Sequence, residues 1–432
     1  MPTLRESLRG FRFAVERDWQ FVLATFAASG IGYLGSAAAP FIVQALIEFG
    51  LSHREAGDLG TIELTTLALA SMIMTPLVPY VSHRKLAIAG VSTAVLGLAI
   101  SALAVDYFPM LLGRLIIGTG SGLAISGANA AIAAREEAER IFAIIWTMGG
   151  AITGALAINM PRLVADGNYS VGFVVLIALS LCAAPFMFWL PPRPVAFAEG
   201  LDTGPQITSG EVHAGRFGPF GVSAVLVLAA MFIYAISEQA LWQFCYELAL
   251  DAGMAVDAVS WIMGFTVFMG LAGGAIAAWL GLRMGRVFPL VLGSLLSLVG
   301  RWAWIAAPDT GTLWVAGVFW GLGYYFVLPY QMGLAAGIDR RGRVAVAAGG
   351  LSNLGYGLGP GLGGRIRQYQ VDNDLDHTML IVVIAGMTVL SMVLLLPVAA
   401  RMDRRSRAAA ARSDAGSAEA SAAEFTEEPW GR

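Results

Sequence analysis

Glu238 is the residue whose type and setting could do chemistry in this sequence. It lies near the middle of an apolar run over residues 218–246, and Tyr234, Trp242 and Cys245 recur around it at spacings of three and four residues. This spacing places the four side chains on one face of a helix. A carboxyl group in such surroundings can take up and release a proton when the surroundings change, so the sequence predicts a proton-transfer site. The alternative is a structural carboxylate paired with a buried arginine.

Arg114 is a second charge inside an apolar run, which covers residues 107–134. A charge in such a run is costly and usually has a function. Glycines follow it at alternate positions from Gly118, and glycines let a neighbouring helix approach closely. Two interpretations stay open: Arg114 binds an anionic ligand or balances Glu238, or it stabilises helix packing by donating to backbone carbonyls.

The composition indicates what surrounds these runs. The chain has 432 residues, of which 57% are hydrophobic and 13% are charged, whereas soluble domains carry about 25% charged residues. We therefore predict an integral protein of the cell (inner) membrane, with the lipid bilayer around it. The net charge of −3 gives no indication of a nucleic-acid partner, and we expect a monomer.

Residues that bind metals or phosphates are not clustered in this sequence. The four histidines fall in predicted loops, and Cys182 and Cys245 fall in apolar runs, where buried thiols are the simpler interpretation. A phosphate-binding loop of the Walker type is not found. We therefore predict no metal, no cofactor and no ATP-driven activity.

The apolar runs predict an all-α membrane protein with twelve transmembrane helices, because one span needs about 20 residues. The predicted spans are residues 20–46, 62–81, 86–105, 107–134, 141–164, 170–190, 218–246, 258–281, 287–306, 311–336, 344–364 and 378–399. With the N-terminus inside, nineteen Arg and Lys residues lie in cytoplasmic segments near the spans and four lie in outer loops. This asymmetry satisfies the positive-inside rule and predicts that both termini are cytoplasmic.

Two further charges fall near the ends of predicted spans. We expect Glu63 to lie close to the outer water interface, and Arg301 to extend toward the interface or to support neighbouring helices. Ser52 and Glu55 have the spacing of a capping box, which predicts the start of a helix between them.

Polar segments divide the chain. Residues 191–217 begin with PPRP and continue with Gly, Asp, Thr, Ser and a few charges, which is typical of a linker. The tail lacks apolar periodicity, so we predict disorder from about residue 408. The predicted parts are a cytoplasmic N-terminal segment (1–19), an N-terminal six-helix half (20–190), a cytoplasmic linker (191–217), a C-terminal six-helix half (218–400) and a cytoplasmic tail (401–432).

The two halves repeat each other with an offset of 203 residues. The related pairs are Gly118 and Gly321, Gly120 and Gly323, Glu136 and Asp339, and Arg140 and Arg343. We therefore expect two pseudo-symmetric halves. The residues expected to pack helices together are Gly118, Gly120, Gly122, Gly321, Gly323, Gly359, Pro360, Gly363 and Gly364.

The span from about residue 20 to residue 400 resembles the major facilitator superfamily. Arg114-x-x-x-Gly118-x-Gly120 is similar to a motif of that family's fourth helix, and GPGLGG at residues 359–364 is similar to a glycine-proline motif of its members. In proton-driven drug antiporters that motif lies in helix five, whereas here it lies in helix eleven. The resemblance implies two six-helix halves that alternately open a central cavity to each side of the membrane.

The resemblance also implies a cytoplasmic gate of salt bridges. The family usually has an acidic residue and several basic residues between helices two and three, but residues 82–85 and their counterpart, residues 281–286, lack the acid. We expect acids elsewhere to replace it. The predicted gate residues are Arg84, Lys85, Arg140, Arg283, Arg286 and Arg343, with Glu136, Glu139 and Asp339 as the acids.

Helices one, four, seven and ten line the cavity in this family, so the resemblance assigns a substrate pathway to these spans. The tenth span is rich in Trp and Tyr, which suits a ring-bearing or amphipathic solute; lipid-facing aromatic residues are the alternative. The predicted pathway residues are Gln44, Arg114, Ser121, Asn129, Tyr234, Trp242, Trp320, Tyr324 and Gln331, with Glu238 for proton coupling.

The implied function is that of a secondary active transporter, not an enzyme, for a small organic solute that is aromatic or amphipathic and, if Arg114 faces it, anionic. We expect coupling to protons, and symport rather than efflux because helix five lacks the Gly-Pro pair of the antiporters. A proton-driven exporter of drugs or metabolites is the alternative within transport. A non-transporting receptor and a lipid-modifying membrane enzyme are alternatives from other classes, and the short loops argue against the enzyme.

Overall fold

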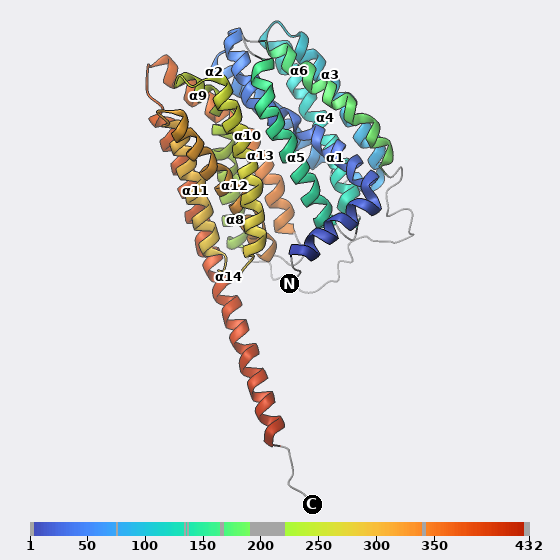
Figure 1. Ribbon diagram of the computed structural model, residues 1–432, viewed down its shortest axis with the longest axis vertical. Coiled ribbons are helices and arrows are strands. Elements are labelled where there is room, and N and C mark those ends of the chain that lie inside the picture. Colours follow the sequence, from blue (N-terminus) through green and yellow to red (C-terminus); the bar gives the residue numbers. More distant parts are fainter. Residues whose placement is uncertain are drawn as a thin grey trace, which may run out of the picture.

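The computed structural model describes residues 4–74, 77–133, 135, 138–164, 168–190, 221–338 and 343–426, with side chains described for most of them from residue 19 to residue 407. Within these ranges the chain is helical and contains no strand. Figure 1 shows α1 to α6 gathered beside α8 to α14, with the N-terminus and the long final helix at one end of the bundle. The predicted linker, residues 191–217, lies outside the described residues.

The helices follow the predicted spans closely. Their bounds are α1 Leu4–Phe49, α2 His53–Met74, α3 His83–Leu103, α4 Tyr107–Ala133, α5 Ala138–Leu163, α6 Tyr169–Ala183, α8 Val222–Trp242, α9 Cys245–Asp251, α10 Val256–Leu280, α11 Val287–Ile305, α12 Thr310–Ile338, α13 Arg343–Asp372 and α14 Thr378–Thr426, with short 3-10 turns at Val78–Tyr80 and Ala184–Trp189. Ten are long and apolar enough to cross a membrane. The more polar α2 and the glycine-rich α13 complete the predicted arrangement of twelve.

Two details differ from the sequence-based expectation. The seventh predicted span is interrupted, because α8 ends at Trp242 and the short α9 follows after a turn at Gln243 and Phe244. The expected disorder from about residue 408 is also not what the structure has, since α14 continues as a helix to Thr426. The alanine-rich sequence of this segment explains the difference, because alanine has the highest helix propensity.

The start of α2 is capped as predicted. The Glu55 N–H donates to Ser52 Oγ (3.2 Å), and the Ser52 N–H donates to Glu55 Oε2 (2.9 Å). This capping box is confirmed, and it places His53 as the first residue of α2.

The pseudo-symmetry of the halves is visible in helix boundaries and glycine contacts. The offset of 203 residues relates the starts of α2 and α10, at His53 and Val256, and of α4 and α12, at Tyr107 and Thr310. Gly118 lies against α2 and Gly120 against α3, while their counterparts Gly321 and Gly323 lie against α10 and α11. A side chain at any of these four glycines would meet backbone atoms of the neighbouring helix.

Helix α13 joins the two halves because it is packed between α8 and α2. Gly359 and Gly363 lie against α8, where an added Cβ at Gly359 would come within 2.8 Å of the Ile236 carbonyl. Gly364 lies against the start of α2, where an added Cβ would come within 2.5 Å of the His53 carbonyl. The predicted packing motif of residues 359–364 thus lies at an interface between the halves.

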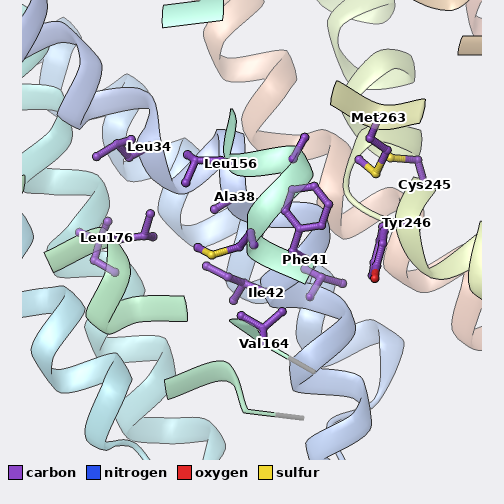
Figure 2. Close-up of a cluster of buried hydrophobic side chains, with 14 of the residues drawn as sticks. Leu34, Ala38, Phe41, Ile42, Leu156, Val164, Leu176, Cys245, Tyr246 and Met263 are labelled. Carbon is purple, nitrogen blue, oxygen red and sulfur yellow. The ribbon is translucent and has the colours of Figure 1, made fainter. Parts of the chain in front are cut away.

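A buried apolar cluster also crosses the halves. Figure 2 shows side chains of α1, α5 and α6 beside Cys245 and Tyr246 of α9 and Met263 of α10. The rings of Phe41 and Tyr246 are 5.2 Å apart in an edge-to-face arrangement. Figure 1 shows α9 at the end of the bundle opposite the termini, so this contact joins the halves there.

Candidate functional site

A cavity of about 210 Å³ lies between the halves, with walls from both of them. A second cavity of about 220 Å³ shares residues with it on α1, α5 and α12 and extends toward the end of α4 and the start of α5. The shared residues are Tyr33, Ala37, Trp146, Thr153 and Tyr325. The two cavities are therefore neighbouring chambers of one central space.

Glu238 lines the first chamber, and among the described residues of its wall it alone carries a charge. The Trp320 indole N–H donates to Glu238 Oε1. On the other oxygen, Glu238 Oε2 lies 3.2 Å from the Arg301 guanidinium. The carboxylate is thus between a neutral donor from α12 and a cation from α11, at the edge of the central space.

Arg301 is entirely buried, which makes the expectation that it extends to the interface wrong. Its guanidinium donates to Ser237 Oγ and Thr388 Oγ1, each at 2.7 Å, and to the Ser297 carbonyl at 3.3 Å. These acceptors come from α8, α14 and α11. Because a buried cation needs such partners, Arg301 can stay satisfied whether or not Glu238 is charged.

Aromatic side chains form most of the remaining wall. Trp320 packs edge-to-face on Trp242, with ring centres 6.0 Å apart. The hydroxyls of Tyr324 and Tyr356 are 2.7 Å apart, and Tyr324 stacks on Tyr234, which lies behind it. Large aromatic surfaces with few polar groups are typical of sites for ring-bearing solutes.

The predicted pathway residues separate into two groups. Glu238, Trp242, Trp320 and Tyr324 line the first chamber, and Asn129 lines the second. The other predicted residues are not among the described residues of either wall; these are Gln44, Arg114, Ser121, Tyr234 and Gln331. Accordingly α1, α8 and α12 contribute to the walls as the resemblance implies, whereas α4 contributes little.

Arg114 has a partner that the sequence analysis did not foresee. It forms a buried ion pair with Glu63 of α2, and its guanidinium lies over the Phe173 ring, 4.9 Å from the ring centre. Glu63 is only 5% exposed, so its expected place near the water interface is wrong. The pairing removes the reason for expecting an anionic solute, because this arginine is neutralised behind the wall.

A charged network lies at the α9 end of the bundle. His53 Nε2 lies 2.9 Å from Glu247 Oε1, and the Arg367 guanidinium donates to both oxygens of Glu247. Arg367 also donates to Asp251 Oδ2 at 2.7 Å and lies 3.0 Å from His377 Nδ1. Since His53 begins α2 and the other residues belong to the second half, this network links the halves.

The network sets the ionisation of its acids. Burial would raise the pKa of Glu247, but the hydrogen bond from His53 and the Arg367 guanidinium hold it below its ordinary value. Burial and the neighbouring Glu247 raise the pKa of Asp251 to about 6. Glu247 is therefore the permanent anion of the network, and Asp251 is its titratable member.

Further polar bonds join the halves. The Arg365 and Asp58 side chains are 2.7 Å apart, and the exposed side chains of Arg162 and Asp257 are 2.8 Å apart. Both pairs involve the ends of helices that lie on the α9 side. These bonds between the halves lie at the end opposite the termini. Two others are also described: the Gly361 N–H donates to Thr61 Oγ1 at 2.7 Å, and the Trp242 N–H donates to the Ser36 carbonyl at 3.1 Å beside the cavity.

Comparison with protein families shows which family the chain belongs to. The model of the Major Facilitator Superfamily matches residues 21–360. The chain belongs to this superfamily. It is a multi-pass membrane transporter of that type, as its sequence motifs predicted.

Solved structures of major facilitator transporters share the fold. One is a bacterial homologue of the human lysosomal transporter Spinster, in an inward-facing and unoccupied conformation, with a TM-score of 0.64 at 18% identity. The match covers 90% of this chain and 98% of the homologue. The nucleoside transporter NupG has a TM-score of 0.66 at 14% identity, and the match covers 88% of this chain and 99% of NupG. A POT family transporter in complex with 5-aminolevulinic acid has a TM-score of 0.63 at 12% identity, and the match covers 87% of this chain and 95% of that transporter. Comparison with curated proteins gives no match.

The predicted gate of this major facilitator protein is only partly described. Arg286 pairs with Asp403 of α14 at 3.4 Å, an acid that was not among the predicted partners, and the Arg84 guanidinium donates to the Leu190 carbonyl. Lys85 is exposed at the start of α3, and Arg283 lies over the Trp279 ring. Glu136 and Asp339 lie outside the described residues, as do the side chains of Glu139, Arg140 and Arg343.

Several residues of the transporter cavity were missed by sequence reasoning. Gln239 and Tyr356 line the first chamber, and Tyr33, Trp146 and Tyr325 line both chambers. Gln239 and Tyr325 directly follow predicted residues, so a broader helical face would have included them. Tyr356 precedes the interface glycines of α13 by one turn or more, and its place in the wall depends on how α2, α8 and α13 pack together.

Proposed function

We propose that this transporter couples solute movement to protons through Glu238. The observation that carries the proposal is the position of this carboxylate, which lines the central cavity while paired with Arg301. An acid at membrane depth is costly and is a candidate for a proton relay. A proton that enters the cavity can bind Glu238 while the Arg301 guanidinium keeps three neutral hydrogen-bond acceptors, from the Ser237 and Thr388 hydroxyls and the Ser297 carbonyl.

Trp320 is the element that can connect protonation to the solute. Its N–H donates to Glu238, while its ring forms part of the cavity wall beside Trp242. Protonation of Glu238 weakens a hydrogen bond to a charged acceptor, which is stronger than a bond to a neutral one. The position of an indole that contacts the solute therefore depends on whether the proton is bound.

The proposed substrate is a small ring-bearing or amphipathic solute without a net negative charge. Aromatic rings and apolar side chains make up most of the wall, and its single described charge is already paired. A carboxylate ligand would lie beside Glu238 at low dielectric, where like charges repel strongly. Symport remains the proposed direction, because the segment from Gly149 to Gly154 of α5 lacks the Gly-Pro pair of drug antiporters.

The basic residues near the spans support a proposed orientation with both termini in the cytoplasm of the inner membrane. The bonds between the halves gather at the opposite end. Together these observations favour a state whose cavity faces the cytoplasm. We also propose that a monomer is sufficient, since both cavity walls come from one chain.

The test is uptake into proteoliposomes with an imposed pH gradient, using solutes first selected by a thermal-shift screen, since ligands that bind the folded state raise its melting temperature. Glu238→Gln should still bind solute but lose accumulation against its gradient. Glu63→Gln is the matched control, because it also removes a buried carboxylate but one behind the wall, and it should keep accumulation per folded molecule. Accumulation by Glu238→Gln with unchanged pH dependence would contradict proton coupling through this residue, and absence of flux for every solute bound would favour a receptor.

A further inference from the structure

The Gln239 side chain carries a polar group that the protein leaves without a partner. Gln239 follows Glu238 on α8, lines the first chamber and is only 7% exposed. Its amide nitrogen Nε2 is buried and has no hydrogen-bond partner among the described residues. A buried donor without a partner is unfavourable, so this position calls for a partner that enters the cavity.

Several other donors of the same wall are already used within the protein. The Trp320 N–H donates to Glu238, and the Trp242 N–H donates to the Ser36 carbonyl. One of the Tyr324 and Tyr356 hydroxyls donates to the other, and the Thr266 hydroxyl donates to the Ile262 carbonyl at 2.8 Å. The amide nitrogen of Gln239 differs from the two indole N–H groups and the Thr266 hydroxyl because it is buried with no partner among the described residues.

The packing of α13 fixes where this amide lies. An added Cβ at Gly359 would come within 2.7 Å of Gln239 Cβ, so the stem of the glutamine lies directly against the glycine. The close approach of α8 and α13 leaves the stem little room to turn away. The amide is thus positioned by the interface between two helices, as is usual for groups that determine specificity.

We infer that Gln239 determines specificity by donating a hydrogen bond from its amide nitrogen to an uncharged oxygen acceptor, such as a carbonyl, on a ring-bearing solute. This inference rests on the proposed function, since it names the polar group of the same aromatic solute. Water can satisfy the amide when the cavity is empty. A solute without an acceptor displaces that water and leaves the donor unpaired, so the site discriminates against it.

The test compares two rigid probes of nearly the same shape, 9-fluorenone, which has a carbonyl, and fluorene, which lacks it. Binding is measured by quenching of tryptophan fluorescence with the full chain in lipid nanodiscs. The wild type should bind fluorenone roughly tenfold more tightly than fluorene, the ratio expected for one unpaired buried donor. Gln239→Met keeps the length of the side chain but has no donor, so its ratio should fall to near one.

Gln331→Met is the matched control. Gln331 of α12 is also a buried glutamine whose Nε2 has no partner among the described residues, but it does not belong to the described wall of either chamber. This variant should keep the ratio of the wild type, and its melting temperature shows what loss of a buried amide does to the fold. Gln239→Leu provides a second donor-free variant if the methionine variant folds poorly.

The outcomes separate the two proposals. Equal binding of both probes by the wild type, or an unchanged ratio in Gln239→Met, overturns the role of Gln239 while the aromatic cavity stands. A reduced ratio in Gln331→Met as well as in Gln239→Met also overturns it, because the effect would then not be specific to the wall. Binding of neither probe by the wild type overturns the proposed ring-bearing solute and this inference with it.

Discussion

Gly35 of α1 and Glu238 of α8 occupy equivalent positions in the two halves, 203 residues apart, and the Glu63 carboxylate lies where a side chain at Gly35 would be. In the second half the buried carboxylate is on α8 itself, and in the first half it reaches the equivalent place from α2. Each carboxylate pairs with a buried arginine, Arg114 or Arg301. The repeat thus conserves the place of an ion pair while the residues that supply it differ.

Gly35→Ala should destabilise the protein, because the added methyl group would overlap Glu63 Oε1 and force the ion pair to move. Overpacking of a buried site costs about 1–3 kcal/mol. The measurement is the midpoint of thermal unfolding in detergent. Gly30→Ala on the same helix is the control, since its added methyl group would lie 3.7 Å from the Phe26 ring, and it should leave the midpoint nearly unchanged. Equal midpoints for the two variants would show that Glu63 is free to move aside.

The ion pair between Glu63 and Arg114 should show strong coupling in a double-mutant cycle. Either single change, Glu63→Gln or Arg114→Met, leaves a buried group unpaired and should lower the free energy of unfolding by about 3 kcal/mol. The double variant should lose much less than the two single losses combined, because it leaves no buried charge. Additive losses, measured by denaturant unfolding, would show that the two charges are stabilised independently.

Much of the architecture could be predicted from sequence because its signals are local. Hydrophobic length predicted the twelve spans, and the glycine repeat predicted the equivalence of α4 and α12. Glu238 stood out because it is an acid within an apolar run. Its partner Arg301 lies 63 residues further along the chain, and only the packing of α8 against α11 and α14 brings the guanidinium to it.

The side-chain predictions that the structure contradicts failed because they, too, depend on contacts between helices that are distant in the sequence. Glu63 and Arg301 were placed by their distance from span ends, which ignores that neighbouring helices can supply partners inside the membrane. The free donor of Gln239 could not be predicted either, since its freedom depends on which groups the surrounding helices leave unbonded. Polar satisfaction is a property of the whole packing and not of one segment.

The His53 and Glu247 contact should control opening at the α9 end. Glu247→Gln removes the charge that His53 and Arg367 share, so the halves should separate there more often. Cys245 is completely buried two residues before Glu247, and it reports opening by reaction with a membrane-impermeant maleimide in a Cys182→Ser background. The labelling rate should rise roughly tenfold, the effect of one lost buried bond to a charged group.

The control for this prediction is Arg162→Ala. It removes another pair between the halves, but both of its side chains are more than half exposed, and exposed pairs contribute little. Its labelling rate should stay close to that of the wild type. A similar increase in both variants would show that any lost contact at this end opens it, without a special role for the buried network.

Asp251 should make stability depend on pH between its ordinary pKa and the raised value of about 6. The folded protein keeps the proton over this range while the unfolded chain releases it, so the stabilising contribution of this group is complete at acid pH and is lost as pH rises toward about 6.

The Asp251→Asn variant tests this prediction because its side chain cannot titrate. The melting temperature of the wild type should therefore fall relative to that of Asp251→Asn between about pH 4 and about pH 6, and the difference should stay constant above. The shift should be modest, because the Asp251 side chain is half exposed and water screens its repulsion from Glu247. Asp257→Asn is the comparison variant, since Asp257 also follows α9 but lies outside the network and pairs with Arg162. A difference that instead grows in favour of the wild type with rising pH would mean that the pairing with Arg367 outweighs burial and the neighbouring Glu247 charge.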